Sequence, residues 1–312
     1  MERSTRESLV SEFLLRGFSS QPELQGFLFP LFLTMYVLNV LGNGTIIFVI
    51  RSDMQLLQSP MYYFLSQLAI ADLCSTSTVV PKMLENLLSQ KKTISYHGCI
   101  IQICFYGYFV NLDNFLLAAM AYDRYVAICY PLSYLALMSH KNCLQLATAC
   151  WTLPLLDALL YTVLMARVEF CDPGEIPHFF CDIYPMLDIS CSDTSLIELL
   201  LMTEGSVDIL GPFVLILISY IFIFYAIMKI PSATGKRKAF STCGSHLSVV
   251  VLFIGTLSWV YLKPHSRNLK LQDIVATVMY GMVTPMLNPF IYSLRNSEMK
   301  AAMRRIIRQY FH

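Results

Sequence analysis

Seven apolar stretches, each long enough to cross a membrane, recur along the chain. A bilayer-spanning helix needs about 20 mostly apolar residues, and backbone in lipid must be hydrogen-bonded within its own segment. Residues 26–50, 239–262 and 274–294 carry no charge, whereas 59–81, 99–121 and 143–166 carry one each and 199–228 carries two. The pattern predicts seven transmembrane helices, at about 26–50, 58–80, 98–125, 142–165, 197–228, 238–262 and 272–294.

The remaining segments are polar or amphipathic. Residues 1–25 hold many charges and no apolar block, so they do not read as a cleavable signal peptide but as an extracellular N-terminus. A long loop is expected at about 167–196. In 295–312, one face carries Met299, Met303, Ile306, Ile307 and Tyr310 against a basic face, which predicts an amphipathic helix on the inner leaflet. The fold class is an all-α membrane protein: a seven-helix bundle with a short cytoplasmic helix.

Composition agrees with a membrane protein. Of 312 residues, 56% are hydrophobic and 14% charged, with a mean hydropathy of +0.56, whereas soluble domains average about 25% charged residues. A net charge of +1 gives no basic surface for nucleic acid. No Walker loop, Ser-His-Asp set or His-Glu-x-x-His motif occurs, so no enzyme activity is expected.

Charge and cysteine positions bear on orientation. The basic clusters "GKRK" (235–238) and "RRIIR" (304–308) lie beside membrane ends, as inner-side segments do. Cys99, Cys171, Cys181 and Cys191 gather around one aqueous face, which favours two disulfides on an oxidising side; four free thiols in a cytosolic loop are the alternative. If the four cysteines form two disulfides on an oxidising side, the N-terminus lies on that same outer side of the membrane.

Several motifs lie in a fixed order along this pattern. A cysteine opens the third span, "DRY" closes it, and "NPFIY" (288–292) lies in the seventh. With "PMYYFLSQLAIAD" (60–72), "MAYDRYVAICYPLSY" (120–134), "SY" (219–220), "KAFSTCGSHL" (238–247) and "PMLNPFIYSLRN" (285–296), the chain resembles olfactory receptors of the tetrapod-type class, within the rhodopsin-like G-protein-coupled receptors.

The resemblance implies an odorant receptor of the plasma membrane, in the cilia of olfactory neurons. Such a receptor binds a small, mostly apolar organic ligand in the outer half of the bundle, activates a heterotrimeric G protein of the stimulatory olfactory type and raises cAMP. A chemoreceptor of the same fold in another tissue is the nearest alternative, and an ion-coupled transporter is a more distant one. The N-terminus lacks the Asn-x-Ser/Thr glycosylation site usual in the family, so trafficking chaperones are expected partners.

The resemblance also assigns residues. It implies the disulfides Cys99–Cys181 and Cys171–Cys191, and ligand contacts at Tyr106, Gly107, Val110, Asn111, Leu257, Ser258 and Tyr261. In helix six, Ile254 replaces the aromatic residue that usually follows Phe253. For signalling, it implies roles for Asp123, Arg124, Tyr125, Tyr220, Lys238, Asn288, Pro289 and Tyr292. In that scheme Asp123 holds Arg124 at rest, and activation releases it.

Acidic residues inside the spans are the remaining candidates for a function. Glu204 and Asp208 are one turn apart and share a helix face, so they either accept a hydrogen bond or a cationic group from the ligand, or pair with protein groups. Asp72 and Asp113 each lie about 20 Å from their helix ends, near the midplane. A sodium ion between them is one hypothesis; a shared proton or a hydrated polar network is the alternative. No other cofactor is expected.

Overall fold

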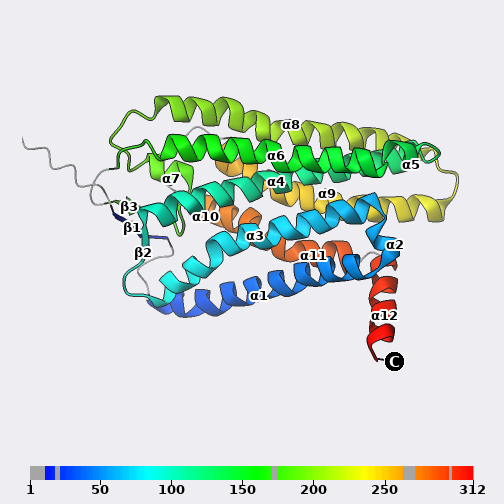
Figure 1. The fold of residues 1–312 in the computed structure, drawn as a ribbon, viewed down its shortest axis with the longest axis horizontal. Coiled ribbons are helices and arrows are strands. Elements are labelled where there is room, and N and C mark those ends of the chain that lie inside the picture. The colour runs from blue at the N-terminus through cyan, green and yellow to red at the C-terminus, as the bar shows by residue number, and fades with distance from the viewer. Residues whose placement is uncertain (1–10, 18–21, 171–173, 263–270, 295–296, 312) are drawn as a thin grey trace, which may run out of the picture.

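The computed structural model describes residues 11–17, 22–170, 174–262, 271–294 and 297–311. Long helices run side by side along the molecule (Figure 1). They are α1 (Pro22–Ser52), α3 (Pro60–Leu88), α4 (Tyr96–Cys129), α6 (His140–Met165), α8 (Ser195–Met228) and α9 (Ala233–Tyr261), and a seventh that joins α10 (Leu271–Val278), the π-helical turn η1 (Met279–Val283) and α11 (Thr284–Leu294). The predicted seven-helix bundle is confirmed.

Six of the described helices are long and apolar enough to span a membrane by length and composition alone. The helix outside that set is α3, which carries Asp72 and the polar run 75–78 (STST) within its apolar stretch and Lys82 and Glu85 beyond it. It has 29 residues, and it packs between α1 and α4. Burial against two neighbours lets this helix carry more polar residues than a lipid-facing one.

Two helices differ clearly from the ranges predicted for them. The range of about 58–80 is too short, since α3 continues to Leu88 through Pro81; the proline lies far enough inside the helix that its neighbours re-satisfy the backbone. The sixth helix begins before 238, at Ala233, where the Ser232 hydroxyl accepts from the Gly235 amide as an N-cap. The basic "GKRK" cluster is therefore helical.

One end of the bundle is covered by elements that hydrophobic spacing did not reveal. Strand β1 (Glu12–Leu15) pairs with β2 (Thr93–Ser95) antiparallel and with β3 (Glu175–Ile176) parallel, in the order β2-β1-β3. The short helix α7 (Ile183–Leu187) follows in the same loop. We call these three strands and α7 the cap; Figure 1 shows it at one end of the helices.

The opposite end carries the short helices α2 (Met54–Leu57), α5 (Tyr134–Leu137) and α12 (Ser297–Phe311), and α12 turns away from the bundle (Figure 1). The predicted amphipathic helix is thus present. Tyr62 donates to Glu298 at 3.0 Å, and Arg305 contacts Asp53, which connects α12 to α3 and to the segment after α1.

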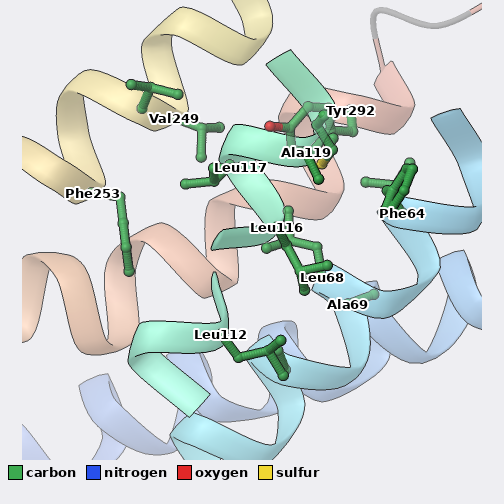
Figure 2. Close-up of a cluster of buried hydrophobic side chains, with 14 of the residues drawn as sticks. Phe64, Leu68, Ala69, Leu112, Leu116, Leu117, Ala119, Val249, Phe253 and Tyr292 are labelled. Carbon is green, nitrogen blue, oxygen red and sulfur yellow. The ribbon is translucent and has the colours of Figure 1, made fainter. Parts of the chain in front are cut away.

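The core lies where α3, α4, α9 and α11 meet. Figure 2 shows Phe64 and Leu68 of α3 beside Leu116 of α4, with Phe253 of α9 and Tyr292 of α11 close by. Leu116 and Phe64 are fully buried. Because lipid is as apolar as these side chains, they stabilise the bundle through close van der Waals packing between the helices. This core separates the cap end from the α12 end.

Candidate functional site

A cavity lies between α4, α6, α8 and α9, and α7 of the cap also lines it. Its volume is about 90 Å³, several times what one water molecule requires. The lining mixes apolar, aromatic and acidic side chains, namely Ile103, Tyr106, Gly107, Val110, Asn111, Asp157, Ala158, Tyr161, Asp182, Ile183, Tyr184, Leu201, Gly205, Asp208, Ile209, Leu257 and Tyr261. A concave, mostly apolar pocket with a few polar groups is typical of a small-molecule site.

Most of the residues predicted to contact a ligand line this cavity. They are Tyr106, Gly107, Val110 and Asn111 of α4, Asp208 of α8, and Leu257 and Tyr261 of α9. Glu204 and Ser258 are not in the lining. On α8 the lining residues are 201, 205, 208 and 209, and on α9 they are 257 and 261. Glu204 and Ser258 are each one turn from a lining residue, Asp208 and Tyr261, and therefore lie at the edge of the lining face.

Two groups of lining residues were not predicted. Asp157 and Tyr161 come from α6, one turn apart, and Asp182, Ile183 and Tyr184 come from the loop that contains α7. Asp157 was the single charge of its span, which was a usable signal. Asp182 follows Cys181, and the expected Cys99–Cys181 disulfide brings this part of the loop to α4. The disulfide could therefore have indicated that the residues after Cys181 line the cavity.

Hydrogen bonds fasten the loop over the cavity. The Tyr261 hydroxyl donates to Asp182 at 2.7 Å, and the Ile183 amide donates to the other oxygen of Asp182 at 2.8 Å. The Tyr184 hydroxyl donates to the Tyr261 carbonyl at 3.3 Å. Burial raises the pKa of Asp182, and the hydrogen bonds from the Tyr261 hydroxyl and the Ile183 amide oppose that shift. The loop and α9 therefore close the cavity together.

The first predicted disulfide is confirmed. Cys99 at the start of α4 is bonded to Cys181, with the two Cα atoms 5.4 Å apart. Next to it, Gln102 accepts from the Cys181 amide at 2.8 Å and donates to the Thr78 carbonyl at 3.0 Å. For the second pair, Cys171 lies outside the described residues, so the bond to Cys191 stays a prediction.

Comparison with known proteins identifies the family. The family model described as olfactory receptor matches residues 32–310. The chain belongs to the olfactory receptor family. It is 53% identical to olfactory receptor 1f45 of the rat (Rattus norvegicus) over 308 residues, covering 99% of this chain and 98% of the relative.

Two primate relatives agree with this assignment. Olfactory receptor 1G1 of the gorilla (Gorilla gorilla gorilla) is 54% identical over 298 residues, which cover 96% of this chain and 95% of the relative. Human (Homo sapiens) olfactory receptor 1F1 is 50% identical over 303 residues, 97% of each chain. This olfactory receptor is accordingly a multi-pass membrane protein of the rhodopsin-like class, and members of its family are not enzymes.

A polar cluster lies deeper in the receptor, between α1, α3, α4 and α11. Asp72 accepts from the Asn288 amide at 2.8 Å. Asp72 and Asp113 are both almost fully buried. Within the described chain, Asp113 Oδ1 and Asn288 Oδ1 have no hydrogen-bond partner. These oxygens suit a small cation, although the described residues include no group of three or more His, Cys, Asp or Glu placed to hold a metal ion.

The residues predicted to act in signalling lie at the α12 end of the receptor core. Asp123 and Arg124 of α4 are buried, as are Tyr220, Asn288 and Tyr292. Asp123 accepts from the Tyr134 hydroxyl of α5 at 2.8 Å, a contact that the motif analysis did not include. Tyr125 packs on Phe222, and Pro289 lies within α11. Lys238 is in α9, and its side chain is outside the described part.

Tyr220 connects α8 to α9 near Arg124. Its hydroxyl and His246 Nδ1 share a hydrogen bond of 2.8 Å. The charge of Arg124 acts on Tyr220, Cys243, His246 and Tyr292, which places this arginine among side chains of α8, α9 and α11. A movement of α9 would therefore change the surroundings of Arg124 directly.

Proposed function

We propose that this receptor binds a small, mostly apolar odorant in the cavity and activates a heterotrimeric G protein of the stimulatory olfactory type, which raises cAMP. The observation that carries the proposal is the cavity between α4, α6, α8 and α9, lined mainly by apolar and aromatic side chains and bordered by a disulfide-tethered loop. Relatives that share half of the sequence are olfactory receptors.

The proposed mechanism is a shift between two arrangements of the bundle. Leu257 and Tyr261 contact the cavity from α9, and the same helix reaches the surroundings of Arg124 through Cys243 and His246. A ligand that binds one α9 position more tightly favours it in proportion to that difference in affinity. Movement of the α12 end of α9 then frees Arg124 to line the G-protein groove.

We propose that the cap faces the outside of the plasma membrane, in the cilia of olfactory neurons, and that trafficking chaperones assist delivery. The Cys99–Cys181 disulfide lies at the cap end, and disulfides persist on oxidising sides. Arg305 and its basic neighbours lie at the opposite end, beside the membrane, as cytoplasmic segments do. An epitope placed before Glu12 should be labelled on intact cells, whereas one placed after His312 should need permeabilised cells.

We also propose that a sodium ion is bound by Asp72, Asp113 and Asn288. The support is the pair of unpartnered oxygens on Asp113 and Asn288 beside a second buried carboxyl, which a cation would satisfy. Bound sodium would stabilise the resting arrangement. Raising sodium chloride against choline chloride should raise the thermal midpoint of the purified receptor, and Asp113→Asn should remove that effect. Equal midpoints in both salts would favour the shared-proton alternative.

A cAMP reporter assay tests the main proposal. Cells expressing the full chain with a trafficking chaperone are exposed to a chemically diverse odorant panel, and surface density is measured in parallel. The expected result is a concentration-dependent rise in cAMP for a subset of odorants. A receptor present at the surface but silent to every chemical class would overturn the proposal. Odorant-dependent flux in vesicles would instead favour a transporter.

A further inference from the structure

Two acidic side chains on different helices, Asp157 of α6 and Asp208 of α8, line one side of the cavity, and Glu204 lies one turn from Asp208 on α8. Asp157 Oδ2 accepts from the Asn111 side-chain amide at 3.1 Å, and the Asn114 side-chain amide donates to the main-chain carbonyl of Asp208 at 2.8 Å. One amide therefore orients the Asp157 carboxyl and the other holds the α8 backbone at Asp208, and neither supplies a positive charge to this acidic cluster.

No Lys, Arg or His side chain is among the described residues that line the cavity. Ion pairs elsewhere in the described chain join Arg16 to Glu175, Lys82 to Glu85 and Arg305 to Asp53, and none of these residues lines the cavity. Asp157 Oδ1 and Glu204 Oε2 are shielded from solvent, and neither has a hydrogen-bond partner in the described structure. Two neighbouring carboxyls can share one proton, and a cation or a donor from a ligand would satisfy the oxygens that are left.

Tyr161 provides an independent indication of a ligand. It lines the cavity one turn from Asp157, it is only 5% exposed, and its hydroxyl has no hydrogen-bond partner among the described residues. A buried hydroxyl without a partner costs free energy unless something satisfies it. Its oxygen can accept an N–H while Asp157 accepts another. The cavity thus presents several acceptors around one point.

The rest of the lining determines the kind of molecule that fits. Apolar side chains from α4, α8 and α9 surround the remaining space, among them Val110, Ile209 and Leu257. Aromatic rings of Tyr106, Tyr184 and Tyr261 also face it, and aromatic faces attract cations. A ligand with one compact cationic donor and an apolar body would match both parts.

We propose that the preferred ligands of this cavity are small primary amines with an apolar body, whose ammonium group binds Asp157 and Asp208 and donates to the Tyr161 hydroxyl. This inference rests on the proposed odorant-receptor function and narrows its ligand class. An ammonium group has three N–H donors, enough for the two carboxyls and the phenol oxygen. Glu204 lies beside this contact and adds attraction without touching the ligand.

Matched ligand pairs test the proposal in the unaltered receptor. Benzylamine is compared with benzyl alcohol, and cyclohexylmethylamine with cyclohexylmethanol, in the cAMP reporter assay with surface density measured. Each amine should be more potent than its alcohol by about tenfold or more, since hydrogen bonds to charged groups exceed neutral ones. Responses to alcohols or other neutral odorants without any preference for the amines would overturn this inference and leave the proposed function intact. Silence to the whole panel would overturn both.

Isosteric variants locate the contact. Asp157→Asn and Asp208→Asn should each reduce amine potency by about tenfold or more and change alcohol potency much less. Tyr161→Phe should reduce amine potency by a smaller factor. Glu198→Gln is the matched control, since Glu198 lies on α8 outside the cavity and accepts from Thr194. If one of the two aspartate variants fails to reach the surface, the other variant and the matched ligand pairs still test the proposal. Equal losses of potency for amines and alcohols would count against an ammonium contact.

Discussion

Arg305 of α12 contacts Asp53 through two nitrogens, with Nη2 at 2.6 Å and Nε at 2.9 Å from the same carboxylate oxygen. The other oxygen of Asp53 accepts from the amides of Gln55 and Leu56 and thereby caps α2. One carboxylate thus joins the amphipathic helix, the short α2 and the end of α1. Together with the Tyr62–Glu298 hydrogen bond, this side chain fixes the position of α12.

The Asp53 contact predicts a pH-dependent contribution to stability. Burial opposes its charged form, but hydrogen bonds from Arg305 and the two amides, with the Arg305 charge, hold the pKa of Asp53 below its ordinary value of 3.8. A depressed folded pKa adds stability that is fully present above the unfolded value and is lost as pH falls through the folded one. Asp53→Asn keeps an N-cap acceptor but removes the charge that faces Arg305, so it should lower the thermal midpoint of purified receptor at pH 5 to 8 by an amount equivalent to about 1 kcal/mol or more.

Below about pH 4, that difference between wild type and Asp53→Asn should shrink. Arg308→Ala is the control, because it removes a neighbouring charge of α12 that does not reach Asp53. A difference that stays constant down to pH 3 would contradict a charged Asp53 as its source.

Gly281 and Tyr106 predict a coupled pair of substitutions. A Cβ at Gly281, in the π-helical turn η1, would collide with the Tyr106 hydroxyl. Gly281→Ala should destabilise the receptor by about 1–3 kcal/mol through overpacking. Adding Tyr106→Phe removes the hydroxyl and should recover most of the lost thermal midpoint. Gly255→Ala is the control for the effect of alanine on helix stability, because a Cβ there meets no atom within 4 Å. Additive effects of Gly281→Ala and Tyr106→Phe on the thermal midpoint would contradict the clash.

The cavity volume predicts a size-selective variant. Gly205 lines the cavity, and a Cβ there would meet no atom within 4 Å. Gly205→Leu should fill part of the space and reduce the potency of larger odorants more than that of smaller ones in the cAMP assay. Gly211→Leu, at an equally open α8 position outside the lining, is the matched control. A uniform loss across ligand sizes would point to a folding defect instead of filled volume.

The Tyr134–Asp123 hydrogen bond predicts a change in basal signalling. Tyr134→Phe removes the 2.8 Å donor to Asp123 and should weaken the resting arrangement by about 1.5–3 kcal/mol, raising cAMP without odorant. Arg124→Ala should abolish the cAMP response and leave odorant binding largely intact. Tyr130→Phe, which removes the acceptor of the Tyr125 hydroxyl, is the control. Unchanged basal cAMP in Tyr134→Phe at equal surface density would show that this bond does not restrain activation.

The sequence allowed the helices to be predicted better than the cap. Charge-free runs such as 26–50 are sufficient to indicate a span, because lipid excludes charge wherever the helix faces. Strand β1 is only four residues long and has partners far along the chain, at Ile94 and Glu175. Local periodicity does not contain such long-range pairing, so residues 11–17 showed no predicted element.

The same distinction explains the candidate site. Spacing along a helix gives depth in the membrane, and it placed Asp208 and Tyr261 at suitable depths. Rotation about the helix axis depends on neighbouring helices, so spacing did not show that Glu204 and Ser258 lie at the edge of the cavity face and outside its lining. Asp157 was visible as a lone charge, but only the packing of α6 against α4 turns it toward the Asn111 amide.

The parallel pairing of β1 with β3 has a consequence for the order of assembly. Leu14 is synthesised before its partner Glu175, which follows 161 residues later (175 − 14). At about 5–20 residues per second, the strand waits on the order of ten seconds or more for that partner. By then four long helices must be in place. A paired β1 therefore indicates that the first four long helices have been inserted. An antibody specific for the paired strand would detect only chains that have reached this stage.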